Sequence, residues 1–591
     1  MTAATTPDTP NFSLDPKVAK DFGVYAAGFW SGPTRMRAWL LTLGLAASLV
    51  ASTYVTVQMN HWNRWFFDAL EKKDVVTVQQ AMLVFVAIIA LMAAIGVCIV
   101  YTRETLQVRW RQWLVEHVLA GWLGRQRFYH MNVDGTEPPN PEYRISDDTR
   151  WATEVLVDLG IGLVSAVVGG IAFISILWSV GGSWTFGGVT IPAFMVVLAL
   201  AYGIVMSVLM AWIGRPLVGR VGAKNESEGY FRFATMRLRD NAESVALMGG
   251  AGAERVSLGR FYDTVVARWL AVVRSHCHVT WITNSSGPMI PIVPLLFAAP
   301  KYLAGELTLG QVTQLAAAFV QVQIAISWVV DNYNRIAEWY ASARRVMDIV
   351  YACDGVDRAL ARADAPGAAA LGFEPARTAA LELMSVAIAG RGGEALVRDA
   401  DISLRAGERA FVSGESSVGK SMLVRAIAGL WRKGEGKIRQ KPGARVLIVP
   451  QKAYLPLGTL ADALAYPLAA GTSEDRRRVL GVLDTVGLGH LGPRLDETAR
   501  WDQLLSTGER QRLTVARVLL HRPDVVVLDD ALSALEEATQ RELLATMRRE
   551  LPDMAVLSLG QRFAADGFHD RHLLLERTAA GARLRPATET V

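Results

Sequence analysis

Long apolar stretches without charged residues dominate the first 330 residues of the chain. Several of them have about twenty residues, which is enough to cross the hydrocarbon core of a bilayer. One uncharged stretch, 159–214, is too long for a single crossing, and Gly181-Gly182-Ser183 predicts a turn between two spans within it. The pattern therefore predicts a membrane α-helical domain with about six spans. The expected spans are 38–60, 81–101, two within 159–214, and the more polar 279–300 and 307–330.

Basic residues indicate which side of the membrane each connection faces. Arginines gather in the two long segments after the second and fourth spans, whereas the segment after the third span has no charge. Positive charge is typical of the cytoplasmic side, and six spans put both ends of the chain on one side. We therefore expect both termini in the cytoplasm. Residues 11–32 mix aromatic side chains with Lys17 and Lys20, which predicts a helix lying in the membrane interface.

Polar side chains within the last expected span have two interpretations. Gln314, Gln321 and Trp328 are seven residues apart and so share one face of a helix. Hydrogen bonding between helices is the favoured interpretation, and contact with a transported solute is the alternative.

Composition agrees with a chain that lies largely in lipid. Of the 591 residues, 51% are apolar and only 20% are charged. The net charge of +5 is small for this length and gives no reason to expect a nucleic-acid partner. Three widely spaced cysteines exclude a disulfide framework.

A phosphate-binding loop organises the remainder of the chain. Residues 414–421 fill every fixed place of the pattern G-x-x-x-x-G-K-[ST], with a strand expected before the loop and a helix after it. In such a loop the backbone N–H groups bind a triphosphate, the lysine adds positive charge and the last hydroxyl binds Mg²⁺. The candidate nucleotide-binding residues are Gly414, Glu415, Ser416, Ser417, Val418, Gly419, Lys420 and Ser421.

Two aspartates follow a short apolar run at 525–528. The run is β-branched and does not alternate, as expected of a strand buried on both faces of a parallel sheet. A carboxylate at the end of such a strand, beside a phosphate loop, is well placed to bind Mg²⁺, which is the role expected of Asp529. The next carboxylate, Asp530, is expected to position the attacking water.

A second candidate for nucleotide contact is the signature segment, Ser506-Thr507-Gly508-Glu509. Ser506 and Glu509 have the spacing of a capping box before a helical run. Such a segment presents free N–H groups at the start of a helix, which suits a γ-phosphate.

These motifs, in this order, resemble the nucleotide-binding domain of ATP-binding cassette (ABC) transporters. Gln451, at the end of an apolar strand, resembles the family's glutamine loop, which implies contact with Mg²⁺ and a role in catalysis. The membrane half resembles the SbmA/BacA-like bacterial transporters and the peroxisomal fatty-acyl transporters at residues 106–114, 140–145 and 237–244. Residues 454–460 of the soluble half resemble the same group.

The resemblance implies an exporter-type membrane domain followed by a P-loop α/β ATPase domain, with ATP and Mg²⁺ as cofactors. It also implies a bacterial cytoplasmic membrane and uptake of peptides or of large amphipathic or hydrophilic solutes such as cobalamin. The expected parts are an interfacial N-terminus (1–37), a transmembrane domain with helical cytoplasmic extensions (38–350), a linker (351–380), the ATPase domain (381–580) and a tail (581–591).

The chain departs from the family pattern at several places. Asp530 stands where the family usually has a catalytic glutamate, Gln561 where it has a histidine, and Glu536 where it has an aspartate. The shorter Asp530 withdraws its carboxylate by roughly 1.5 Å, and Gln561 cannot become cationic. Residues 386–390, where the family often has an aromatic residue that stacks on adenine, contain none.

These departures leave alternatives open. A chain with one ATPase domain must pair, and we expect a homodimer, with a heterodimer as the alternative in which this chain is the degenerate half. Export of a lipid or hydrophobic compound is an alternative to uptake, and an ATP-binding membrane sensor is an alternative to a transporter.

Overall fold

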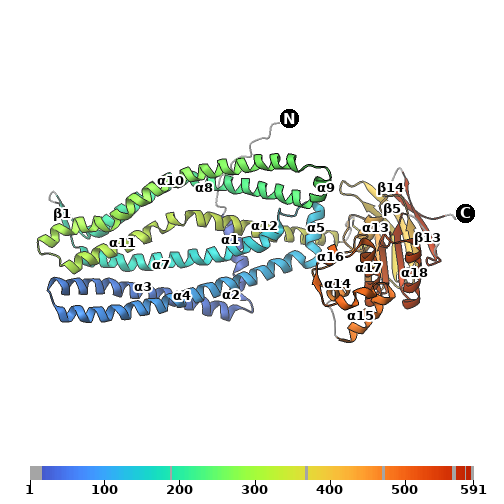
Figure 1. Cartoon of the computed structure of the whole chain (residues 1–591), viewed down its shortest axis with the longest axis horizontal. Coiled ribbons are helices and arrows are strands. Elements are labelled where there is room, and N and C mark those ends of the chain that lie inside the picture. The colour runs from blue at the N-terminus through green and yellow to red at the C-terminus, as the bar shows by residue number, and fades with distance from the viewer. Residues whose placement is uncertain are drawn as a thin grey trace. The chain divides into compact units, whose positions relative to one another are not determined.

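The computed structural model describes residues 16–186, 189–365, 370–468, 473–561, 567–578 and 581–587. Its internal contacts divide the chain into two compact units, Met1–Cys353 and Asp354–Val591. The first is almost entirely helical, and the second contains a large sheet with helices (Figure 1).

Six helical segments among the described residues are long and apolar enough to cross a membrane. They are Arg35–Glu71, Val75–Asp134, Pro141–Gly181, Phe194–Asp240, Ala251–Leu303 and Leu309–Ala363. Each contains one of the predicted spans, so the prediction of six spans is confirmed. The segments are much longer than the apolar stretches because charged sequence continues the helices beyond them, and the arginines expected in long connections lie on these extensions.

The helices that begin in the first unit are α1 (Pro16–Ala26), α2 (Gly28–Ser31), α3 (Arg35–Glu71), α4 (Val75–Leu123), η1 (Gly124–Gln126), α5 (Arg127–Asp134), α6 (Pro141–Tyr143), η2 (Arg144–Asp148), α7 (Thr149–Gly181), α8 (Phe194–Asp240), α9 (Ala242–Leu247), α10 (Ala251–Leu303), α11 (Leu309–Asp331) and α12 (Tyr333–Ala363). The turn predicted at 181–183 is confirmed, since α7 ends at Gly181. An antiparallel hairpin of β1 (Trp184–Phe186) and β2 (Val189–Ile191) then leads to α8.

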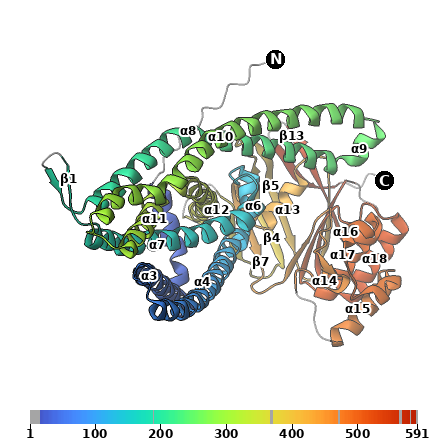
Figure 2. The same cartoon turned by 60° about the vertical axis from the view of Figure 1, so that its left-hand side comes forward.

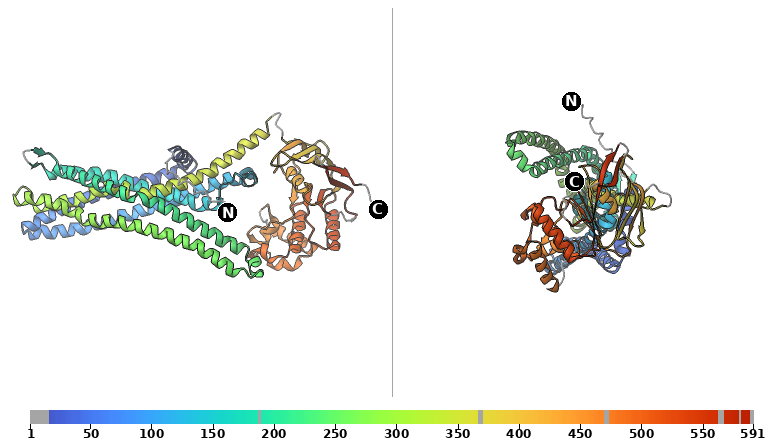
Figure 3. Two further views of the ribbon diagram at one scale, coloured as in Figure 1. Left: turned by 90° about the horizontal axis from the view of Figure 1, so that it is seen from above. Right: turned by 90° about the vertical axis from the view of Figure 1, so that its right-hand side faces the viewer.

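The long helices pack side by side, with α3 against α4, α8 against α10 and α7 against α11 (Figures 1 and 3). The side chains where α7, α8 and α11 meet are almost completely buried, and they include Phe173, Leu177, Met195, Leu315 and Phe319. Their burial is the expected result of three apolar helix faces that meet one another.

Polar groups of α11 form hydrogen bonds with neighbouring helices. The Gln323 amide donates to the Ala199 carbonyl oxygen at 2.8 Å, and Asn60 donates to the Gln314 carbonyl oxygen at 3.2 Å. The Gln314 side chain is 1% exposed and lies 3.3 Å from His61. Gln314 therefore serves contact between helices, which is the interpretation favoured for it from the sequence.

Two ion pairs, each with one buried member, bind α12 to the turn η2. Asp148, which is fully buried at the end of the π-helical turn η2, binds Arg345 of α12 at 2.6 Å. Arg144 at the start of the same turn binds Asp348 at 2.7 Å. Asp148 and Arg144 are buried, whereas the side chains of Arg345 and Asp348 are 40% and 39% exposed. Removal of Arg345 or Asp348 would therefore leave a buried charge without its ion-pair partner.

The N-terminal helices pack through aromatic side chains on other helices of the first unit. Phe22 and Phe29 are at most 2% exposed, and their rings contact Trp339 and Trp113 with centroids 6.2 and 6.3 Å apart. These rings of α1 and α2 therefore pack on tryptophans of α12 and α4, and the place of the helix in the membrane interface stays a prediction. Residues 11–15 of the predicted helix lie outside the described residues.

The stretch expected as a linker, 351–380, contains regular structure. Helix α12 continues to Ala363, because the sequence after Tyr351 contains several alanines and arginines, which favour a helix, and Cys353 and Val356 are buried. Strand β3 (Gly372–Pro375) then pairs with β7 (Gly434–Gln440). Among the described residues of 351–380, only short segments are therefore in neither a helix nor a strand.

The second unit is built on a sheet whose described strands run in the order β3-β7-β4-β5-β14-β13-β6-β12-β11-β8. Its other strands are β4 (Leu381–Ala389), β5 (Ala395–Leu404), β6 (Arg409–Ser413), β8 (Val446–Val449), β11 (Val525–Asp529), β12 (Ala555–Gly560), β13 (Arg571–Thr578) and β14 (Gly581–Pro586). Strands β9 (Gly458–Thr459) and β10 (Thr498–Ala499) form a separate antiparallel pair. The helices are α13 (Lys420–Ile427), α14 (Leu460–Ala465), α15 (Ser473–Thr485), η3 (Gly489–Arg494), α16 (Trp501–Leu504), α17 (Thr507–His521) and α18 (Glu537–Glu550).

Strands β13, β6, β12, β11 and β8 are parallel neighbours, so their carboxyl ends lie at one edge. Residues 525–527 of β11 are fully buried, as the apolar run predicts. Figure 2 shows α14, α15 and α16 grouped to one side of the unit, away from β4 and β7. The predicted P-loop α/β fold is therefore confirmed. Ligands of open α/β sheets bind at the carboxyl edge of the strands.

Candidate functional site

The phosphate loop lies between β6 and α13, with the predicted order of strand, loop and helix. A Cβ on Gly414 would lie 2.7 Å from the Leu575 carbonyl oxygen, and one on Gly419 would lie 2.9 Å from Val397. Gly419 also has a φ of +117°, and Ser417 one of +63°. These left-handed conformations curl the backbone, which turns successive N–H groups toward one point and so forms a concavity for an anion.

Lys420 turns back over the loop. Its Nζ donates to the carbonyl oxygens of Gly414 and, at 2.8 Å, of Glu415. Burial lowers the pKa of Lys420, and the neighbouring carboxylates of Asp530 and Asp529 oppose this effect. The ammonium group is thus held at the loop, where a bound phosphate would replace the two carbonyl oxygens as its partner.

Ser421 and Asp529 bring two oxygen donors together. The Ser421 hydroxyl donates to Asp529 Oδ1 at 3.4 Å, which joins the start of α13 to the end of β11. Burial is the main reason that the pKa of Asp529 lies above its usual value. A carboxylate with few compensating charges, beside a hydroxyl oxygen, is the donor set that suits a hard cation such as Mg²⁺.

Asp530 and Gln451 meet because β8 and β11 are parallel neighbours in register. Gln451 Nε2 donates to Asp530 Oδ2 at 3.4 Å. The Asp530 backbone has a φ of +52°, and its carbonyl oxygen accepts a hydrogen bond from the Ser533 hydroxyl at 2.8 Å. Aspartate tolerates the left-handed region better than most residues with a Cβ, so the conformation suits the residue found here.

Gln561 follows β12, the strand between β6 and β11. Gly560 pairs with Ser413, the last residue before the phosphate loop, so the exposed Gln561 emerges at the same edge as that loop. The sheet order thus brings the phosphate loop, Gln561, Asp530 and Gln451 to four successive strand ends.

The signature segment forms the predicted capping box at the start of α17. Ser506 Oγ accepts from the Glu509 N–H at 3.3 Å, while Glu509 Oε2 accepts from the Ser506 N–H at 2.9 Å. Hydrogen bonds from Ser506, with a smaller contribution from His490, hold the pKa of the Glu509 carboxyl below its usual value. The first N–H groups of a helix have no partner within it, so those of Thr507 and Gly508 are available to an anion.

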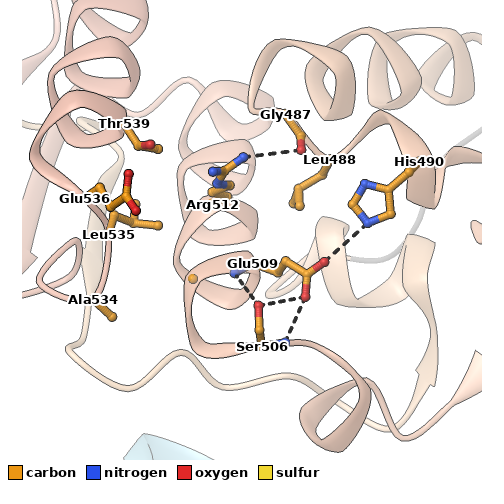
Figure 4. A pocket seen from close by; sticks show the side chains of 11 residues that line it. Gly487, Leu488, His490, Ser506, Glu509, Arg512, Ala534, Leu535, Glu536 and Thr539 are labelled. Atoms are coloured by element: carbon orange, nitrogen blue, oxygen red, sulfur yellow. Dashed lines mark hydrogen bonds and ion pairs between the residues drawn. The ribbon is translucent and has the colours of Figure 1, made fainter.

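A cavity of about 480 Å³ lies between this segment and the turn that leads to α18 (Figure 4). His490 Nε2 on one wall is 3.3 Å from Glu509 Oε1, the carboxylate oxygen that Ser506 does not bind. Arg512 donates to the Gly487 carbonyl oxygen at 3.5 Å. Glu536 lies on the opposite wall at the cap of α18 and makes no capping hydrogen bond there.

Two contacts near this cavity, His490 with Glu509 and Gln511 with Ala534, were not predicted from the sequence. His490 is far from the signature segment along the chain, and no local pattern indicates that η3 brings it beside Glu509. Gln511 is buried, and its Oε1 accepts from the Ala534 N–H at 2.9 Å, which fixes the turn after Asp530 to α17. A buried glutamine within a polar helical sequence has no periodic signal that distinguishes it.

The candidate residues form two sets within the chain. The phosphate loop, Asp529, Asp530 and Gln451 are joined through the carboxyl edge of the sheet, whereas the signature segment belongs to the cavity at α17. Within the part of the chain that the structure describes, no hydrogen bond or ion pair connects residues 506–509 with residues 414–421.

The region expected for adenine contains no free aromatic face among its described neighbours. Residues 386–389 end strand β4, and the Ala389 carbonyl oxygen accepts from the Trp431 indole at 2.8 Å. Trp431 is itself 5% exposed. The ring thus supports the strand end and has little surface for stacking on a base.

Comparison with known proteins agrees with both units. Residues 30–303 match the family described as ABC transporter transmembrane region 2, and residues 397–533 match the family described as ABC transporter. An uncharacterised ABC transporter ATP-binding protein of Synechocystis is 31% identical over 90% of this chain and 79% of its own length. The inner membrane ABC transporter ATP-binding protein YddA of Escherichia coli is 26% identical over 90% and 92%. The human lysosomal cobalamin transporter ABCD4 is 25% identical over 91% of each chain.

The chain therefore belongs to the ABC transporters, with a transmembrane region and an ATPase domain fused in one polypeptide. It is an ATP-hydrolysing membrane transporter of the half-transporter type, related to ABC transporter family D and to bacterial half-transporters. The resemblance noted in the sequence is confirmed at the level of the family.

Proposed function

We propose that the chain acts as a homodimer in the bacterial inner membrane and uses ATP to take up peptides or large amphipathic or hydrophilic solutes such as cobalamin. The observation that supports pairing is the separation of the two candidate sets within one chain. In a pair, the phosphate loop of one copy and the signature segment of the other would enclose each ATP, so that ATP binding closes the two ATPase domains. Ser421, Asp529 and Gln451 would hold Mg²⁺, while Asp530 and Gln561 would position the water and the γ-phosphate.

Gly508 supports a close approach by a second copy. A Cβ on Gly508 would lie 3.5 Å from Leu535, which is an ordinary contact, so nothing within the described chain requires a glycine there. Glycine lets a backbone N–H come close to a ligand. A phosphate bound by the partner copy would approach the Gly508 backbone closely, which would account for a glycine at this position.

Closure drives transport only if ATP binds the closed dimer more tightly than the open one, since equal affinity would shift nothing. The arginine-rich extensions of α4 and α8 support cytoplasmic termini, because basic residues favour that side. Uptake of cobalamin rests on the name of a relative that is 25% identical, and uptake of peptides rests on the resemblance to the SbmA/BacA-like transporters.

Vesicles that contain only this chain would test the function. ATP added outside acts on copies whose ATPase domains face outward, so for these copies cellular uptake corresponds to movement out of the vesicle. We expect preloaded radiolabelled cobalamin or peptide to leave on addition of ATP and Mg²⁺, and Lys420→Ala vesicles to retain it. ATP-driven accumulation inside would indicate export. ATP binding without movement of solute would favour a sensor or a heterodimer.

His490 yields a prediction about the proposed dimer. In His490→Ala the Glu509 carboxylate loses its contact with the imidazole. Glu509 would then be less firmly held and would orient Ser506, which it binds through Oε2, less well. The contact is largely exposed, so an effect of about two- to five-fold on kcat is expected, with nucleotide affinity at the chain's own phosphate loop unchanged. His490→Gln keeps a donor and should restore most of the rate.

Steady-state ATPase kinetics of the reconstituted chain would measure this effect. His521→Ala is a matched control, because His521 lies at the other end of α17 and contacts the Tyr466 carbonyl oxygen. Equal rates for His490→Ala and His521→Ala would contradict a positioning role for His490.

A further inference from the structure

An apolar groove runs along the membrane unit beside its N-terminal helices. It has a volume of about 400 Å³ and lies between α1 and α2 on one side and spans α3, α4 and α7 on the other. Ala26, Trp30, Ala46, Leu49, Gly160 and Val164 are among the residues that line it. Ligand pockets in proteins are typically about 300–1,000 Å³, so the groove has the size of a binding site.

Small residues on opposite walls keep the groove open. A Cβ built on Gly23 of α1 or on Gly160 of α7 would meet no atom within 4 Å. Interiors of proteins are otherwise close-packed, and an unfilled apolar space loses contacts on every wall. The groove therefore gains from an apolar occupant.

The polar groups of the lining tryptophans are either bonded or enclosed within the protein. The Trp30 indole donates to the Thr42 hydroxyl at 3.0 Å, so that pair is satisfied. Trp110, whose ring centroid is 4.9 Å from that of Trp30, is 3% exposed, and its indole N–H has no hydrogen bond among the described residues. This nitrogen is enclosed within the protein, so the groove offers an occupant mainly apolar surface.

Positive charge lies beyond one end of the groove. Arg35 begins α3 and shares a helix face with Thr42 and Leu49, because these residues are seven apart. At 1.5 Å per residue, Arg35 is roughly 10 Å along the helix from Thr42. Arg35 is exposed and makes no ion pair with any described carboxylate, and Lys20 of α1 is also exposed.

We propose that this groove binds one acyl chain of an anionic membrane phospholipid. The apolar walls take the chain, and Arg35 binds the phosphate. The source is the bilayer, because the groove lies between three membrane-spanning helices and Arg35 precedes the apolar part of α3, at the level of lipid headgroups. The site is separate from the ATPase unit and does not depend on which solute is transported.

Photolabelling tests the proposal. The full-length chain is placed in nanodiscs of phosphatidylcholine that contain phosphatidylglycerol with a photoactivatable diazirine in one acyl chain, and the labelled peptides are mapped by mass spectrometry. We expect labels in the peptides of α1, α3 and α7 that line the groove. Excess unlabelled phosphatidylglycerol should abolish them, and excess phosphatidylcholine should not.

Variants distinguish this site from general contact with lipid. Gly160→Phe fills the groove from α7 and should lose the label, whereas Gly169→Phe on the same helix, also in open space but outside the groove, should keep it. Gly23→Phe fills the groove from α1, so loss in both filled variants cannot reflect a local fault of α7. Arg35→Gln should remove the preference for phosphatidylglycerol.

Equal labelling of Gly160→Phe, Gly23→Phe and Gly169→Phe would show general bilayer contact only and overturn the proposal. Competition by phosphatidylcholine as strong as that by phosphatidylglycerol would overturn the role of Arg35 and of the anionic headgroup. Labelling that disappears when cobalamin or peptide is added would mean that the groove belongs to the solute path, which would also overturn the assignment to lipid.

Discussion

Replacement of Lys420 by alanine is expected to remove most of the ATP affinity of the chain. The ammonium group is held beside the phosphate loop by two carbonyl oxygens, and no other lysine occupies that loop. Charge-assisted hydrogen bonds contribute about 1.5–3 kcal/mol each, so we expect ATP affinity to fall by at least about ten-fold. Fluorescence titration with a nucleotide analogue, on the chain in lipid nanodiscs, would measure this loss.

Lys441→Ala is the matched control for this experiment. Lys441 is an exposed lysine of the same unit, in the turn after β7, and should leave affinity unchanged. ATP affinity in Lys420→Ala equal to that of Lys441→Ala would remove the phosphate loop from the binding site, and with it the nucleotide assignment of residues 414–421.

The sequence was sufficient to predict those parts of the molecule that follow from local pattern. Uncharged stretches of about twenty residues have few stable places outside a bilayer, and all six corresponding helices are present. The capping box at Ser506 and Glu509 and the buried strand ending at Asp529 are likewise set by residues close in sequence.

Contacts between distant segments were beyond such prediction. The burial of Phe22 against Trp339 requires the N-terminal helix to meet the last long helix of the unit. The contact of His490 with Glu509 depends on how η3 packs beside α17. The left-handed backbone of Asp530 depends on the turn held by Ser533 and Gln511. Each of these follows from tertiary packing, for which a single sequence carries no periodic signal.

The conformation of Asp530 changes the interpretation of its departure from the family. A glutamate would extend the carboxylate by roughly 1.5 Å, but the backbone φ of +52° is one that aspartate tolerates well. Gln451 already binds the Asp530 carboxylate at 3.4 Å, so this side chain is oriented within the edge that contains the phosphate loop. We infer that Asp530 itself serves as the base in a homodimer.

Asp530→Asn should therefore lower the ATPase kcat of the purified chain in lipid by roughly 10²-fold or more, the usual contribution of a general base. The amide keeps the size and the turn but cannot accept a proton, so ATP affinity should stay near that of the wild type. Asp530→Glu keeps a carboxylate and serves as the matched control, with turnover expected to persist. A wild type without turnover that Asp530→Glu fails to activate would contradict the homodimer, because the catalytic carboxylate must then come from a different partner chain.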